Sequence, residues 1–99
     1  MIEEVNETNF KEVLKGKRVL VDFNATWCGP CRMLKPILEE LNEENKIKII
    51  SVDVDKCENL ASEYGISSIP CLIIFNDLSE EKRNIGLMSL SDLEEFIGE

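Results

Sequence analysis

Residues 19–31 of the chain read Val19-Leu20-Val21-Asp22-Phe23-Asn24-Ala25-Thr26-Trp27-Cys28-Gly29-Pro30-Cys31. The stretch joins an apolar run with a single acid in it, residues 19–23, to two cysteines that are separated by Gly29 and Pro30. Such a compact apolar run predicts a buried β-strand. Proline is common in the first turn of a helix and glycine permits a tight turn, so we expect a helix to begin at about Cys28. The stretch therefore predicts a strand, a short connection and a Cys-x-x-Cys motif at the start of a helix.

The Cys-x-x-Cys motif has a spacing that suits thiol–disulfide exchange. Two intervening residues let the thiols close a ring when the first cysteine opens a helix, and exchange starts from a thiolate. The free amide hydrogens and positive dipole end of the helix favour a thiolate at Cys28, whereas Cys31 lies one turn further in and should be more sheltered. We therefore expect Cys28 to attack a target disulfide and Cys31 to resolve the mixed disulfide that forms.

The same motif also occurs as half of a zinc site, as a structural bridge or by chance. A zinc site needs about four ligands, but only Cys57 and Cys71 remain, without paired spacing, and the chain has no histidine. The missing histidines also exclude a Cys–His nucleophile pair. In a reducing compartment a close cysteine pair is more often catalytic or metal-binding than structural. We expect no metal and no bound cofactor.

The composition indicates one small acidic domain. The chain has 99 residues, of which 43% are hydrophobic, so we expect a single domain over residues 1–99 with one packed core. Its formal charge of −9 repels phosphate backbones and acidic lipids, so neither nucleic acid nor membrane is an expected partner. No secretory signal, transit peptide or long apolar span is present, which predicts a cytoplasmic protein.

Strand-like and helix-like segments alternate along the rest of the chain. Apolar spacing and turn residues predict strands over residues 2–5, 19–23, 47–54, 71–75 and 82–85. Helices are expected between Asn6, as a cap, and Gly16, over about 28–45 with a bend at Pro36, over about 58–64, and from the cap Ser89 onward. The order βαβαβαββα predicts an α/β protein with a mixed sheet covered on both faces.

Several of these positions match one family. The run WCGPC at residues 27–31 is highly specific among proteins with a Cys-x-x-Cys motif, and the match extends from Val21 to Met33. Pro36, the segment 64–70 that ends in Pro70, and Gly86 match further family positions. In these residues the chain resembles the thioredoxin family over nearly its whole length. The resemblance implies the thioredoxin fold, a central mixed sheet of about five strands flanked by four helices.

The resemblance also assigns roles near the cysteines. Asp22 matches the family's buried acid, which implies a general acid/base for Cys31 that acts through water. An acid in a buried strand is costly unless it is paired or functional, although a strand-end acid that reaches solvent is the alternative. Pro70 matches the family's cis-proline and would leave the backbone of Ile69 free to pair with an extended substrate. By resemblance, a flat apolar docking surface is formed by Trp27, Gly29, Pro30, Ile69, Pro70 and Gly86.

The function implied by the resemblance is that of a protein disulfide reductase. Such a thiol–disulfide oxidoreductase takes electrons from a flavin-dependent thioredoxin reductase and passes them, as a monomer, to disulfide-containing client proteins. Two alternatives remain open, an oxidase or isomerase of the same fold and a non-catalytic binding module. The Gly29-Pro30 dipeptide favours the reductase, and the retained Asp22 and Pro70 argue against the binding module.

Four positions depart from the family pattern. Asn24 stands where many members carry an aromatic residue, and Ser51 where bacterial members often place a lysine near the buried acid. Leu78 replaces a common turn glycine, so this turn is expected to be built differently. Cys71 replaces a common threonine and is expected to be a small buried thiol. The alternative for Cys71 is a place close enough to Cys28 for the two to be oxidised together.

Overall fold

The structure is a computed structural model that describes residues 1–98. These residues contain five strands and four helices, joined by turns and loops. In chain order they are β1 (Glu3–Glu4), α1 (Phe10–Leu14), β2 (Arg18–Asn24), α2 (Gly29–Glu43), β3 (Lys48–Asp53), α3 (Glu58–Glu63), β4 (Cys71–Asn76), β5 (Ser79–Ile85) and α4 (Leu90–Ile97). The predicted order of elements is confirmed. No helix within residues 1–98 is long and apolar enough to cross a membrane.

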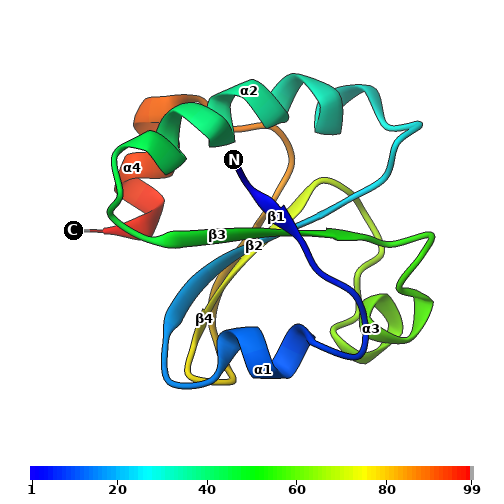
Figure 1. Ribbon diagram of the computed structural model, residues 1–99. Coiled ribbons are helices and arrows are strands. Elements are labelled where there is room, and N and C mark those ends of the chain that lie inside the picture. Colours follow the sequence, from blue (N-terminus) through cyan, green and yellow to red (C-terminus); the bar gives the residue numbers. More distant parts are fainter. Residues whose placement is uncertain (99) are drawn as a thin grey trace.

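The five strands form one mixed sheet in the order β1-β3-β2-β4-β5. Strands β1, β3 and β2 are parallel to one another, whereas β4 is antiparallel to both β2 and β5. Helices α2 and α4 lie over one face of the sheet, and α1 and α3 lie over the other (Figure 1). The most apolar strands, β2 and β4, are interior neighbours, as their burial on both faces requires.

Alternation along β2 and β3 sorts their side chains between the two faces of the sheet. Phe23 packs into the core on the side of α1 and α3. Asp22 and Asn24 therefore point to the other face, where the register pairs Asp22 with Ser51 and Asn24 with Asp53. These four polar residues lie near the carboxyl ends of two parallel strands. The face that α2 covers is thus apolar along most of its length and polar at this end.

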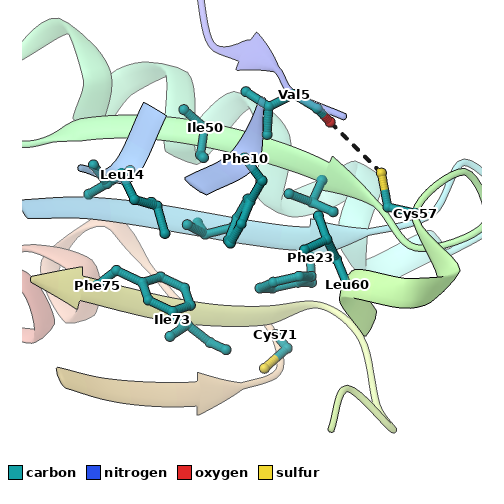
Figure 2. Close-up of a cluster of buried hydrophobic side chains, with 13 residues drawn as sticks. Val5, Phe10, Leu14, Phe23, Ile50, Cys57, Leu60, Cys71, Ile73 and Phe75 are labelled. Carbon is teal, nitrogen blue, oxygen red and sulfur yellow. Dashed lines mark hydrogen bonds between the residues drawn. The ribbon is translucent and has the colours of Figure 1, made fainter. Parts of the chain in front are cut away.

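Aromatic rings, aliphatic side chains and two cysteines form the core between the sheet, α1 and α3 (Figure 2). The rings of Phe10 and Phe75 meet edge to face, with centroids 5.7 Å apart. Cys57 and Cys71 are both buried here as free thiols, and the sulfur of Cys57 donates to the carbonyl of Val5 at 3.9 Å. Burial raises the pKa of both thiols. The expectation of a small buried thiol at Cys71 is confirmed.

The predicted cap of the first helix is wrong. The Asn6 Oδ1 accepts hydrogen bonds from the N–H groups of Thr8 and Asn9, each at 3.0 Å, and so closes a turn ahead of the helix. The helix itself begins at Phe10, with Asn9 as its cap residue. Asparagine often bonds nearby backbone in this way, which competes with helix formation.

The β4–β5 hairpin is tighter than predicted. Strand β5 begins at Ser79, which pairs with Asn76, so the turn contains only Asp77 and Leu78. Both turn residues have positive φ, 52° and 83°, as a type I′ hairpin turn requires. The side chain of Asp77 also accepts a 2.7 Å hydrogen bond from the N–H of Gly16. The charged residues that begin β5 resemble a loop in the sequence, yet charge is common on an edge strand.

Candidate active site

Cys28 and Cys31 form a disulfide at the N-terminus of α2. Cys28 is the cap residue, with extended backbone, and its Sγ accepts a 3.2 Å hydrogen bond from the N–H of Cys31. Pro30 occupies the first turn and, since it has no N–H, leaves no donor unpaired there. Both cysteines are 5% exposed, so the greater shelter predicted for Cys31 is absent from this disulfide form.

The loop before β4 lies against the disulfide. The Ile69–Pro70 peptide bond is cis, and the carbonyl oxygen of Ile69 lies 3.9 Å from the Sγ of Cys28. The carbonyl of Pro70 accepts a 2.8 Å hydrogen bond from the N–H of Gly86, whose φ of 107° suits glycine. The Ile69–Pro70 loop thereby lies beside Cys28, and a backbone hydrogen bond joins the same loop to Gly86.

Trp27, just before the disulfide, lies at the surface with 66% of its area exposed. Its indole Nε1–H donates a 2.8 Å hydrogen bond to the Oδ2 of Asp55. The indole is therefore held at one edge while the rest of the ring stays open to solvent. An exposed ring beside a disulfide is suited to contact with an apolar partner.

Asp22 is buried on the α2 side of β2, with 6% of its area exposed. Its Oδ2 accepts a 3.3 Å hydrogen bond from the side-chain amide of Asn24, and its Oδ1 has no partner among residues 1–98. Burial raises the pKa of Asp22 to about 7, with a smaller opposing effect from the Asn24 hydrogen bond. A carboxyl that is half ionised near neutrality can both accept and donate a proton.

A cavity of about 510 Å³ connects this acid with the disulfide, because Asp22 and Cys31 both line it. Asn24 and Ser51 also line it from β2 and β3, and Lys35 does so from α2. The cavity is large enough for several water molecules, each of which occupies about 30 Å³ in the liquid. Proton exchange between Asp22 and Cys31 through water is therefore sterically feasible.

Comparisons with known proteins agree on one family. The thioredoxin family model matches residues 1–99. The thioredoxins of Chlamydia trachomatis and Rickettsia felis are each 42% identical to this chain, and the match covers 98% of this chain and 96% of each relative. The solved structure of a mutant thioredoxin from Halobacterium salinarum is 35% identical, with a TM-score of 0.87, covering 96% of this chain and 88% of that one.

The chain belongs to the thioredoxin family. With the disulfide of its Cys-x-x-Cys motif, this thioredoxin-family protein is a thiol–disulfide oxidoreductase, and its activity is the reduction of protein disulfides.

Two acidic residues near the disulfide, Asp53 and Asp55, were not among the site residues predicted from the sequence. Asp53 is buried at the end of β3, where its Oδ1 accepts a 2.9 Å hydrogen bond from the N–H of Asp55. Asp55 in turn accepts from Trp27. The sequence offered only one signal, the alternation Val52-Asp53-Val54-Asp55, which is equally typical of a half-buried strand.

Proposed function

We propose that this thioredoxin-family protein reduces its clients by a two-step dithiol exchange led by Cys28. The Cys28 thiolate attacks one sulfur of a client disulfide, forms a mixed disulfide and releases the other client sulfur as a thiolate. The Cys31 thiolate then attacks the sulfur of Cys28, which releases the second client thiolate and forms the Cys28–Cys31 disulfide. One observation supports Cys28 as the first attacker: the N–H of Cys31 points at the Cys28 sulfur at 3.2 Å. A hydrogen bond to a charged acceptor is stronger than one to a neutral acceptor, so this donor stabilises a thiolate at Cys28.

The second step requires Cys31 to lose its proton. We assign the acceptor role to Asp22, which is catalytic in this sense and acts through water in the shared cavity. Its unpaired Oδ1 and its pKa of about 7 support the assignment, because an acceptor is most effective near the working pH.

Client docking is assigned to the surface around the disulfide. Exposed Trp27 would form one side of it, and Ile69 and Pro70 would form another. The Ile69 carbonyl, 3.9 Å from the Cys28 sulfur, marks where an extended client segment would lie along the backbone. Together with Gly29, Pro30 and Gly86, these residues make up the proposed docking surface.

The partners proposed are disulfide-containing client proteins and a flavin-dependent thioredoxin reductase that restores the dithiol. We further propose that the chain acts as a cytoplasmic monomer with one domain over residues 1–99, without nucleic acid or membrane. The family match over residues 1–99 supports the domain and the reductase partner.

Insulin reduction with dithiothreitol as electron source tests the proposal directly. The protein should accelerate precipitation of the insulin B chain, the Cys28→Ser variant should be inactive, and the Cys31→Ser variant should accumulate a mixed disulfide. Full activity in Cys28→Ser, or trapping through Cys31 instead, would overturn the proposed order of attack.

A further inference from the structure

Asn24 has an unusual set of partners for a residue beside a buried acid. Its side-chain nitrogen lies 2.8 Å from the Ser51 Oγ, 2.9 Å from the Asp22 carbonyl oxygen and 3.3 Å from the Asp22 Oδ2. An amide nitrogen has only two hydrogens, so one of them is shared between two acceptors. The two short bonds fix the amide, and the longest contact reaches the carboxyl group.

The two short bonds do not depend on the ionisation state of Asp22. One joins Asn24 to a backbone carbonyl of its own strand, and the other crosses to Ser51 on β3. The amide therefore keeps its position whether the carboxyl is charged or neutral. A donor held in this way favours one orientation of the carboxyl, in which Oδ2 is bound and Oδ1 is unpaired.

Asn24 and Ser51 are also uncharged. Charged side chains line the same cavity from every surrounding element, namely Glu4 from β1, Arg32 and Lys35 from α2, Asp53 from β3, and Lys56 after β3. The residue that donates a hydrogen bond to the carboxyl, Asn24, and the residue that holds this donor, Ser51, carry no charge. They can thus orient Asp22 without the strong stabilisation of its ionised form that a cation would give.

We propose that Asn24, held in place by Ser51, is a positioning residue that orients the Asp22 carboxyl and keeps Oδ1 available for proton exchange with Cys31. The inference rests on the proposed function of Asp22 and extends it to two neutral neighbours on β2 and β3.

The test is the ionisation of Asp22 in the Asn24→Ala and Ser51→Ala variants, measured by NMR of the carboxyl carbon. Loss of the Asn24 donor should move the Asp22 titration upward by about 0.5–1 pH unit, because a hydrogen bond to the charged form is lost. Ser51→Ala should move it in the same direction by less, since the bond from Asn24 to the Asp22 carbonyl remains. Asn24→Ser, which restores a short donor, should recover part of the shift.

A second readout is the rate at which Cys31 attacks the mixed disulfide on Cys28. A mixed disulfide between Cys28 and thionitrobenzoate decays when Cys31 attacks, and stopped-flow absorbance follows the released thiolate. Asn24→Ala should slow this decay on the order of threefold at pH 7 and shift its pH profile upward. In an Asp22→Asn background, Asn24→Ala should cause no further slowing. The matched control is Asn76→Ala, at the far end of β4, which should change neither readout.

The outcomes separate the inference from the proposal on which it rests. If Asp22→Asn leaves the decay unchanged, the proposed role of Asp22 fails. If Asp22→Asn slows the decay but Asn24→Ala and Ser51→Ala leave titration and pH profile at wild-type values, only the positioning role is overturned. Equal slowing by Asn24→Ala with and without Asp22 would also overturn it. Should Asn24→Ala not fold, as judged by circular dichroism, Ser51→Ala carries the test.

Discussion

The indole Nε1–H of Trp27 is bonded to the Oδ2 of Asp55, 28 positions later in the chain, at 2.8 Å. Asp55 is held in turn by its own N–H, which donates to Asp53 at the end of β3. The exposed tryptophan beside the disulfide is therefore anchored to the sheet through the turn after β3. This anchor restricts the indole before any client arrives, which lowers the entropy cost of docking.

Loss of the Trp27–Asp55 hydrogen bond should weaken the binding of a client more than it slows the disulfide exchange. In Asp55→Ala we expect KM for a protein client to rise by about fivefold, equivalent to roughly 1 kcal/mol, with kcat nearly unchanged. Steady-state insulin reduction measures both constants, and Trp27, the only tryptophan, reports its own mobility by fluorescence anisotropy. Asp55→Asn retains an acceptor oxygen and is the matched control. A fall in kcat with unchanged KM would contradict the docking role.

Asp22 should make the protein less stable as the pH rises. Its pKa is raised from 3.8 to about 7 on folding, so between these values the folded state binds more protons than the unfolded state. Stability due to this group is present below pH 4 and is lost as the pH rises through 7. Relative to wild type, Asp22→Asn should therefore gain about 2–4 kcal/mol in free energy of unfolding between pH 4 and pH 8. Urea unfolding across this range measures the gain, and parallel stability curves would refute it.

Local sequence patterns predicted the strands and helices, whereas the site around Asp22 depends on contacts between residues that are distant in the sequence. The apolar runs at 19–23 and 71–75 became interior strands, and Ser89 caps α4 by accepting from the N–H of Asp92 at 3.1 Å. Each of these features depends on residues close together in sequence. The Asn24–Ser51 bond depends instead on the register of two strands, which no local pattern contains.

Two local predictions were wrong, for different reasons. Asn6 has the residue type of a helix cap, but its side chain closes a turn three residues earlier than the cap position. The charged start of β5 lacks apolar alternation because that edge strand packs few of its side chains into the core. The first error thus lies in a choice between two local hydrogen-bonded conformations of Asn6, and the second lies in the place of β5 at the edge of the sheet.

The Asp77–Leu78 turn offers a stabilising substitution. Leu78 has a φ of 83°, a region that costs an L-residue with a side chain roughly 1–2 kcal/mol. Leu78→Gly removes that cost but gives the unfolded chain more freedom, worth about 0.5–1 kcal/mol. A net gain of about 0.5–1 kcal/mol in free energy of unfolding is expected from urea titration. Leu87, also 45% exposed but without positive φ, is the matched control, and Leu87→Gly should not stabilise.

Cys71 should have no part in the redox couple despite its place next to Pro70. Its side chain belongs to the aromatic core with Cys57, whereas Cys28 and Cys31 pack in a separate cluster with Ala25. Burial raises the pKa of Cys71 and so suppresses the thiolate that exchange requires. In reduced protein at neutral pH, iodoacetamide should modify Cys28 first and leave Cys57 and Cys71 unmodified until the protein unfolds, as peptide mass mapping would detect. The glutathione redox equilibrium of Cys71→Ala should equal that of wild type and of the control Cys57→Ala, and a shift confined to Cys71→Ala would establish oxidation together with Cys28.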